Sequence, residues 1–523
     1  MHFQQRFLMK YKLGSIVLIW AILSACGIRS LATTVPTPLQ PTQTATVQIK
    51  TQPLPTSIPI EAVENEAELY APGLINSQQV VLQQMDSANV YQMNLVVSDD
   101  YHTINALQTL HMTNQENTAL DALYFHLFVP YAGGNIIIHN ARVNQLPAKT
   151  SLLEDGAILR INLDQSLPIG SACEVKLEYT LEIPDTMGGN YGLFGYFEDV
   201  LVLDTFYPML AVYDQSGWQA EAPDPVGDQT YTDASYYQVE IQAPADLILV
   251  ASGIQVAAET SGDRQSVRFA AGPVRDFYLA GSTRYTKWSR QVGEVTINSY
   301  AFKENETAAL LALDTAAAAI EIFSEQFIPY PYTEFDVISS PMRALGIEYP
   351  GIVGIGLELY KVDKDGGVPA AMNLESVVVH EVAHQWFYNL VGNDQSNLPW
   401  VDESVTQYAT GLYYQERYNN SAADAYQQSW DGRWARVNSE PIPIGMPARE
   451  YEGPDYSAII YGRGPYFLVE LEKSMGKETF SAFLKQYVTQ YQWQNADTEV
   501  FRQLAESTCN CDLGELFDEW VYP

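Results

Sequence analysis

The sequence has little cysteine and little histidine for its length. Only four of its 523 residues are cysteine and seven are histidine. Four cysteines are too few for a disulfide-stapled fold, and the pairing of Cys173, Cys509 and Cys511 stays open between a bridge to Cys173 and a local bridge. Core material is ample instead, since 47% of the residues are hydrophobic and 12% are aromatic. A chain of this length and composition is expected to form two or three domains.

Positive charge is also scarce. The chain has 28 lysines and arginines against 63 aspartates and glutamates, which gives a formal net charge of −35. This excess of acid argues against nucleic acid or an anionic membrane face as a partner, because both would be repelled. The acidity serves solubility alone, or it also draws a cationic group such as a peptide amino terminus towards the surface.

The first 60 residues differ in composition from the rest. Basic residues at positions 6, 10 and 12 precede an apolar run over residues 13–23, an arrangement typical of a secretory signal and too short for a stable membrane span. The run ends in LSAC (residues 23–26), which is similar to a bacterial lipobox. Residues 1–25 are therefore interpreted as a lipoprotein signal peptide and Cys26 as the lipidation site. An uncleaved anchor helix is the alternative.

Residues 26–60 are rich in threonine, proline and glutamine and carry almost no charge. Such a segment cannot bury a core and is expected to be a loose tether behind the lipidated cysteine. Both interpretations of the amino terminus predict that the remaining chain lies outside the cytoplasm. In the first of them a lipid anchor holds it at the cell membrane.

Beyond residue 60 the sequence predicts an α+β protein of two domains. Residues 61–295 contain short β-rich runs separated by glycine-containing turns, which predicts an N-terminal antiparallel β domain. Residues 296–523 predict a mixed α/β, mainly helical domain. Its predicted strands lie near 335–339 and 346–356, and its predicted helices cover 307–323, 374–390 with Asn373 as cap, 403–418, 461–474, 477–491, 499–506 and 513–520.

The most informative stretch is HEVAH, residues 380–384. On a helix, residues four apart lie on one face, so His380 and His384 can bind one Zn²⁺ with Glu381 beside it. Glu403, separated from His384 by 18 residues, is the candidate third ligand and leaves the fourth position for water. Two satisfied core histidines are the simpler alternative. We favour metal binding, because these are the only histidines after residue 139 and they flank a glutamate.

The arrangement H-E-x-x-H-x18-E resembles that of the gluzincin peptidases, and the surrounding sequence resembles the M1 aminopeptidase family. The matching segments are HEVAHQWFYNLVGNDQ, PWVDESVTQYAT, an upstream GIEYPG and a downstream YGRG. The resemblance covers most of residues 85–523 and implies a thermolysin-like catalytic domain that follows an N-terminal β domain. It also implies one Zn²⁺, Glu381 as general base for water, and peptide substrates.

The resemblance implies further site residues. Tyr461, in the YGRG segment, corresponds to the tyrosine that stabilises the oxyanion in the family. Glu348 corresponds to the glutamate that binds the free amino group of the substrate, and the strand at Gly346 to the backbone that pairs with the substrate. The positions around Glu348 depart from the family pattern G-x-M-E-N. A glutamine that the family places in the β domain has no clear match near residues 206–209.

The sequence therefore predicts a zinc aminopeptidase outside the cytoplasm that removes single residues from peptide amino termini. The alternative is a zinc endopeptidase with an open cleft. It is suggested by the missing glutamine and by the little sequence that follows the catalytic region, where the family commonly has a helical domain. The third hypothesis, a metal-free lipoprotein that only binds, is disfavoured by the complete set of catalytic residue types.

Overall fold

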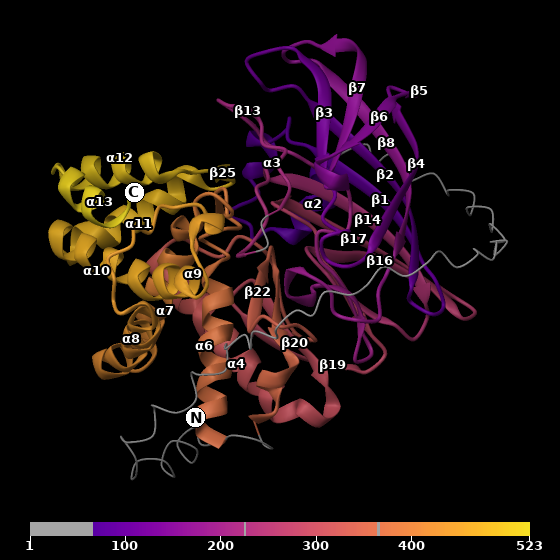
Figure 1. Cartoon of the computed structure of the whole chain (residues 1–523). Coiled ribbons are helices and arrows are strands. Elements are labelled where there is room, and N and C mark those ends of the chain that lie inside the picture. The colour runs from indigo at the N-terminus through magenta and orange to yellow at the C-terminus, as the bar shows by residue number, and fades with distance from the viewer. Residues whose placement is uncertain (1–65, 224–225, 363–366) are drawn as a thin grey trace, which may run out of the picture. The chain divides into compact units, whose positions relative to one another are not determined.

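The computed structural model describes residues 66–223, 226–362 and 367–523, and Figure 1 shows their arrangement. Strands dominate up to residue 302 and helices dominate from residue 306 onward. The predicted order, an N-terminal β domain followed by a mainly helical catalytic domain, is confirmed. The predicted signal peptide, Cys26 and the whole tether with its boundary at residue 60 lie outside the described residues.

The largest layer of the β domain is an eight-stranded sheet in the order β16-β17-β14-β1-β2-β8-β4-β5. Its strands run antiparallel except β1 and β14, which pair in parallel, so the sheet is mixed at this one place. Along β8 buried and half-buried residues alternate, because one face of the strand contacts the core. The strands are β16 (Ile254–Ser261), β17 (Arg264–Val274), β14 (Ser235–Pro244), β1 (Val90–Val97), β2 (Thr103–Thr113), β8 (Ala172–Glu182), β4 (Asn135–Val143) and β5 (Leu146–Pro147).

Two smaller antiparallel sheets and a short hairpin complete the β domain. Short helices precede it: α2 (Glu66–Tyr70), η1 (Ala71–Gly73) and α3 (Val81–Gln84). One sheet consists of β15 (Ile248–Ala251), β18 (Leu279–Ser282), β10 (Val200–Leu203) and β9 (Phe194–Phe197). The other consists of β11 (Met209–Leu210), β3 (Leu120–His126), β7 (Ile158–Leu167) and β6 (Lys149–Leu153), and the hairpin of β12 (Tyr213–Asp214) and β13 (Gly217–Trp218).

A five-stranded sheet leads into the catalytic domain. Its order is β19 (Tyr285–Val292), β20 (Val295–Phe302), β21 (Glu334–Ser340), β23 (Ile352–Gly356) and β22 (Gly346–Tyr349). The predicted domain boundary at residue 295 falls on the first residue of β20, within this sheet. β22 lies at the edge and pairs antiparallel with β23, with Glu348 opposite Val353. The strand that carries Glu348 therefore has one unpaired side among the described strands.

The helices that follow agree with the prediction except at two places. α6 covers Gly367–Ala383 rather than 374–390, so Asn373 lies inside the helix and caps nothing. The helix ends at Ala383 because the amide hydrogen bonds then reach three residues back, from Gln385 to the carbonyl of Val382 and from Trp386 to that of Ala383. From Asn389 onward they reach five residues back, beginning with the bond to the carbonyl of His384. The second difference is that α8 (Asn420–Trp434) and the one-turn helix α9 (Asp455–Ala458) were not predicted. The other helices are α4 (Glu306–Gln326), α7 (Glu403–Arg417), the π-helical turn η9 (Ile459–Arg463), α10 (Gly464–Met475), α11 (Lys477–Tyr491), α12 (Thr498–Cys509) and α13 (Gly514–Trp520).

α4 is the one helix in the described ranges that is long and apolar enough to cross a membrane. Of its most apolar stretch, 61% is buried inside the protein, and the helix packs against α6 and β20. Its alanines, such as Ala309, Ala312 and Ala316, are fully buried. α4 therefore has the surroundings of a core helix.

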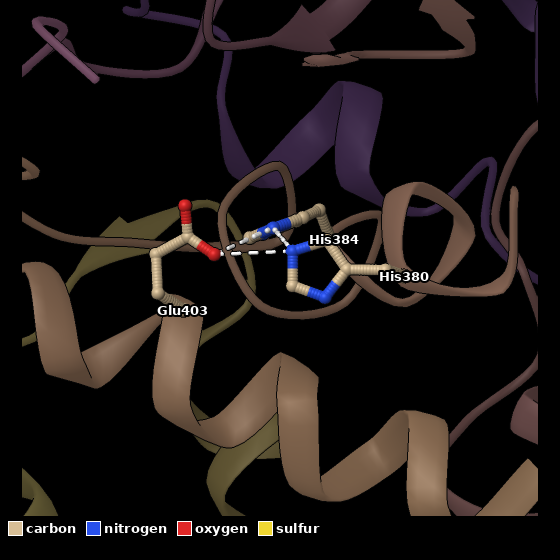
Figure 2. A group of neighbouring side chains, drawn as sticks. All are labelled: His380, His384 and Glu403. Carbon is tan, nitrogen blue, oxygen red and sulfur yellow. Dashed lines mark hydrogen bonds and ion pairs between the residues drawn. The ribbon is translucent and has the colours of Figure 1, made fainter. Parts of the chain in front are cut away.

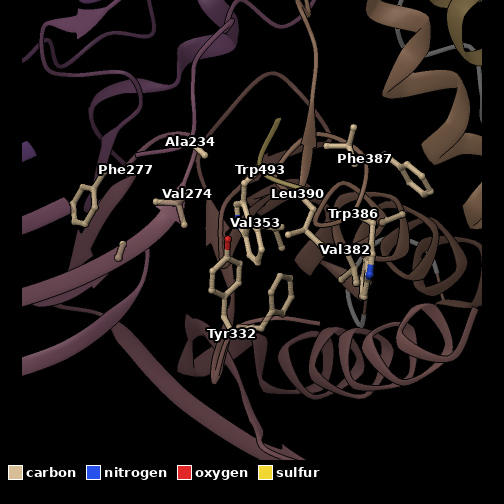
Figure 3. Packing of buried hydrophobic residues seen from close by; sticks show 14 of the residues in the cluster. Ala234, Val274, Phe277, Tyr332, Val353, Val382, Trp386, Phe387, Leu390 and Trp493 are labelled. Carbon is tan, nitrogen blue, oxygen red and sulfur yellow. The ribbon is translucent and has the colours of Figure 1, made fainter. Parts of the chain in front are cut away.

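The hydrophobic core is continuous from the β domain to the catalytic domain (Figure 3). Ala234, Val274 and Phe277 belong to the same cluster as Trp386, Leu390 and Trp493. Arg275 is buried beside this contact and donates to the carbonyl oxygens of Tyr388, Leu390 and Gln494 at 2.6–3.2 Å. The loop that follows α6 is therefore held by the β domain.

The described cysteines form one disulfide. Cys509 and Cys511 are joined across Asn510 at the end of α12, and Cys173 is a buried free thiol. Of the two predicted alternatives, the structure therefore contains the local bridge between Cys509 and Cys511 rather than a bridge to Cys173.

Candidate metal centre

His380, His384 and Glu403 converge from two helices (Figure 2). Both histidines come from α6 and the stretch just after it, and Glu403 is the first residue of α7. The Nε2 atoms of the two rings are 3.2 Å apart. The Oε2 atom of Glu403 lies 3.1 Å from Nε2 of His380 and 3.4 Å from Nε2 of His384. Three potential ligand atoms therefore form a nearly equilateral triangle.

The triangle has the dimensions of a zinc site. Zn–N and Zn–O bonds of about 2.0–2.1 Å at tetrahedral angles place ligand atoms about 3.3–3.4 Å apart. The three measured edges, 3.1, 3.2 and 3.4 Å, are close to this value. One metal ion above the triangle would contact all three atoms and keep a fourth position open. The residues present therefore fit a zinc ion.

Hydrogen bonds orient the side chains that form the triangle. The Nδ1 atom of His384 lies 2.9 Å from the carbonyl oxygen of Phe387 and 3.3 Å from the hydroxyl of Thr406. A proton on Nδ1 satisfies that carbonyl and leaves the lone pair on Nε2, the form that binds a metal. Asp402 caps α7, because its Oδ1 accepts the amide hydrogen of Glu403 at 2.6 Å. The backbone on both sides of the site is thus fixed before any metal binds.

Buried negative charge surrounds the site. Glu348, Glu381 and Glu403 are each at most 5% exposed. Burial by itself raises the pKa of Glu403, but the close contacts with His380 and His384 hold it well below its usual range. Burial alone lowers the pKa of His384, whereas Glu348, Glu403 and Glu381 raise it well above its ordinary value. A divalent cation at the triangle would offset this surplus of buried negative charge.

Glu381 lies against the edge strand β22. A Cβ atom on Gly346 would be 2.3 Å from the Oε1 atom of Glu381, so only glycine permits this approach. Burial raises the pKa of Glu381 well above its usual value, and Glu348 adds to the increase. Glu348, Glu381 and His384 also offer ligand atoms within 4.8 Å of one another. The predicted base and the predicted amino-group ligand therefore share one compact site.

Tyr461 reaches the site from the π-helical turn η9. Its hydroxyl donates to the Oε1 atom of Glu403, while the Oε2 atom of the same carboxylate faces the two histidines. Its ring lies 6.0 Å from that of His380. Burial, followed by Glu403, raises the pKa of Tyr461 well above its usual value, which keeps the hydroxyl protonated. Tyr461 is thus a hydrogen-bond donor beside the triangle.

Glu348 has partners that motif reasoning missed. The Nε2 atom of Gln395 donates to the Oε1 atom of Glu348 at 2.8 Å. Asp204 and Asp276 of the β domain also lie close to Glu348. Burial is the main cause that raises their pKa values, to about 8 and about 7, and the charge of Glu348 adds to the increase. Gln395 is the last residue of the segment HEVAHQWFYNLVGNDQ, so the family resemblance could have indicated it as a residue of the site. The two aspartates belong to no motif.

The comparison with known protein families covers the part of the chain that forms this site. Residues 311–520 match the Peptidase family M1 domain. This part of the chain is therefore similar to an M1 peptidase domain. The matched range contains all seven predicted residues of the site: His380, His384, Glu403, Glu381, Tyr461, Glu348 and Gly346.

Curated relatives match the chain at low sequence identity. Aminopeptidase 2 of Candida albicans is 24% identical over 375 residues, which are 68% of this chain and 39% of that protein. Aminopeptidase M1-B of Oryza sativa is 24% identical over 392 residues, 72% of this chain and 43% of its own length. The chain thus spans about two fifths of the length of these relatives.

Solved structures share the fold over most of the chain. The M1 zinc metallopeptidase from Deinococcus radiodurans matches with a TM-score of 0.60 at 19% identity, over 87% of this chain and 95% of that one. A mutant of that protein bound to a Tyr-Ser-Ala substrate matches with a TM-score of 0.61. The β domain and the catalytic domain therefore belong to a fold known for an M1 zinc metallopeptidase.

Proposed function

We propose that the chain is a zinc aminopeptidase that hydrolyses the N-terminal residue of peptides. The observation that carries the proposal is the triangle of His380, His384 and Glu403, with edges of 3.1–3.4 Å and the carboxylate of Glu381 beside it. The M1 domain, the aminopeptidase names of the relatives and the Tyr-Ser-Ala substrate of the related structure support it.

The proposed chemistry divides among the residues of the site. One zinc ion, when bound, supplies a Lewis acid that makes water acidic and polarises the peptide carbonyl. Glu381 accepts the proton of the attacking water and passes it to the leaving amine, a role that suits a carboxylate whose pKa is raised by burial. The hydroxyl of Tyr461, which donates to Glu403 in the structure, would turn its proton to the carbonyl oxygen as negative charge develops there.

Glu348 is the proposed ligand of the substrate's free amino group. An ammonium placed against Glu348 puts the first peptide bond next to Glu381 and the triangle, because these groups lie within one compact cluster. The free side of the edge strand β22 can pair with the extended backbone of the substrate. Cleavage after one residue follows from this placement.

The test compares each peptide with its N-acetylated form, using the full chain in detergent. We expect the free peptide to lose residues one at a time from its amino terminus, and the acetylated form to be cleaved at least about 100-fold more slowly, since the buried Glu348 would lose its ionic partner. Equal cleavage of both forms would refute amino-group recognition. Internal cuts in an unfolded protein, seen by mass spectrometry, would favour the endopeptidase alternative.

We further propose that the enzyme acts outside the cytoplasm, held at the membrane by a lipid on Cys26. The support is the sequence pattern of residues 1–26 alone. Replacement Cys26→Ser should move the protein from the membrane fraction to the soluble fraction and abolish incorporation of labelled fatty acid. A protein that stays in the membrane without label would indicate the uncleaved anchor helix instead.

A further inference from the structure

A line of hydrogen bonds joins the β domain to Glu348. Gln395 donates to Glu348 at 2.8 Å, and the hydroxyl of Thr230 donates to the Oε1 atom of Gln395. The hydroxyl of Thr230 lies 3.3 Å from that of Tyr388, which in turn donates to the Oδ2 atom of Asp276. All five residues are buried. We refer to these five residues as the Asp276–Glu348 line.

The line brings together segments that are far apart in the sequence. Thr230 lies between β13 and β14, and Asp276 lies between β17 and β18, both in the β domain. Tyr388 and Gln395 flank β24 (Val391–Gly392) in the catalytic domain. The carboxylate of Glu348 is therefore held by groups of both domains rather than by its own strand alone.

Tyr388, one residue of the Asp276–Glu348 line, has an uncommon backbone conformation. Its φ is 142°, in a region that residues with a side chain rarely adopt. Two contacts hold it there: the hydroxyl reaches Asp276 and Thr230, and the carbonyl oxygen accepts from Arg275 at 2.7 Å. Uncommon backbone conformations that are held in place by their surroundings are concentrated at functional sites.

The protonation state of Asp276 decides in which direction the groups of the Asp276–Glu348 line donate their hydrogen bonds. When Asp276 carries a proton, each group can donate to the next one, from Asp276 through Tyr388, Thr230 and Gln395 to the carboxylate of Glu348. When Asp276 is ionised, Tyr388 donates to Asp276 and no proton remains for the contact between Tyr388 and Thr230. The protonated form therefore satisfies every link and concentrates the negative charge of the line on Glu348.

We propose that Gln395 is a positioning residue that, through Thr230 and Tyr388, holds Glu348 for recognition of a free amino terminus. The proposal rests on the proposed aminopeptidase function and extends it, because selectivity then depends on the β domain as well as on the M1 domain. Gln395 itself needs no contact with the substrate. We assign Asp276 the neutral form, in which it donates to Tyr388 at the far end of the line; an ionised Asp276 accepts the hydroxyl proton of Tyr388 instead.

The experiment measures kcat and KM for free and N-acetylated peptides in Gln395→Leu, Thr230→Val and the double variant. We expect KM for the free peptide to rise about tenfold in each single variant while kcat changes less than about threefold, since a hydrogen bond to a buried carboxylate is lost. The preference for free over acetylated peptide should fall by the same factor. The double variant should resemble the single ones, because one line is broken in both.

Thr296→Val is the matched control. The Thr296 hydroxyl also donates to a glutamine oxygen, that of Gln291 at 2.9 Å, but on the exposed hairpin of β19 and β20. This variant should keep the wild-type KM, kcat and preference. Zinc content and thermal unfolding are measured on every variant. If Gln395→Leu fails to fold, Thr230→Val and Tyr388→Phe carry the same test.

Asp276→Asn tests the direction of the line. The amide keeps a donor towards Tyr388 but carries no charge, so we expect KM and preference within about twofold of wild type. A tenfold rise in KM would overturn the neutral role of Asp276. An active wild type with an unchanged preference in Gln395→Leu and Thr230→Val would overturn the inference alone. A wild type without activity on free peptides would overturn the proposed function, and the inference with it.

Discussion

At the scale of single residues, the chemistry of the site depends on which atoms are left free. His384 uses Nδ1 for the carbonyl of Phe387, and Glu403 uses Oε1 for Tyr461. The remaining atoms, Nε2 and Oε2, face the position that a metal would take. Such pairing was not visible in the sequence, because it depends on the turn after α6 and on η9. The spacing of the histidines was visible, because positions four apart meet on any helix.

Glu381→Gln separates metal binding from catalysis. The amide has nearly the shape of the carboxylate but cannot accept the proton of the attacking water, so kcat should fall about 100- to 10,000-fold. Zinc content, measured by atomic emission after dialysis, should stay at one ion per chain, since Glu381 is outside the triangle. Loss of the metal in this variant would mean that Glu381 is a ligand rather than a base.

Tyr461→Phe tests the proposed oxyanion donor. Removal of one such hydroxyl should lower kcat about 100- to 1,000-fold with little change in KM, because the bond strengthens only as charge develops. Tyr456→Phe is the control, since this ring lies 6.1 Å from that of Tyr461 and belongs to the same segment. Equal losses in both variants would point to packing in this segment instead of a bond to the reacting oxygen.

At the scale of elements, the site depends on how helices end and how strands approach. The helices α7 and α11 begin where the sequence predicted, because each start follows a clear change of pattern. The end of α6 was predicted seven residues too late, since the apolar residues after Ala383 continue the helical pattern. They are buried for another reason: Trp386, Phe387 and Leu390 fill the core between the domains. The spacing of apolar residues in a sequence indicates which residues are buried, but it does not indicate the irregular hydrogen bonds that end the helix.

Gly346→Ala tests the close approach of β22 to Glu381. The added methyl group would lie 2.3 Å from the Oε1 atom of Glu381, so the carboxylate or the strand must move. A displacement of about 1 Å at a catalytic group can cost about 100-fold in rate, and we expect kcat/KM to fall by at least tenfold. Gly432→Ala, in α8 with open space around it, should leave the activity unchanged. Wild-type activity of Gly346→Ala would show that β22 can shift freely.

At the scale of the whole described unit, the two domains have one continuous core, and a buried arginine of the β domain, Arg275, donates hydrogen bonds to the catalytic domain. The sequence predicted a β domain and a helical domain, and it could not show that Thr230, Arg275 and Asp276 of the first complete the site of the second. Those contacts join residues 112 to 165 positions apart. No local pattern encodes separations of this size. The β domain is therefore part of the catalytic apparatus in the proposed function, as well as a neighbour in the fold.

Arg275→Met tests this dependence. The arginine is 1% exposed and donates to the carbonyl oxygens of Thr232, Tyr388, Asn389, Leu390 and Gln494 and to the side chain of Asn495. Methionine fills most of the space but leaves these buried acceptors without donors, at about 1–3 kcal/mol for each unsatisfied group. Since a domain is stable by only about 5–15 kcal/mol, the melting temperature should fall by about 10 °C or more.

The activity of Arg275→Met below its melting temperature then shows whether the arginine only stabilises the fold or also helps to position Glu348. Because its guanidinium holds the carbonyl of Tyr388, we expect the variant to show a raised KM for free peptides, as the Gln395 and Thr230 variants do, in addition to its lower stability. Arg268→Met is the control, since this partly exposed arginine pairs with Glu240 at 3.3 Å and should matter by about 1 kcal/mol or less. An unstable Arg275→Met with a wild-type KM would show that the joint between the domains supports the fold without setting the position of Glu348.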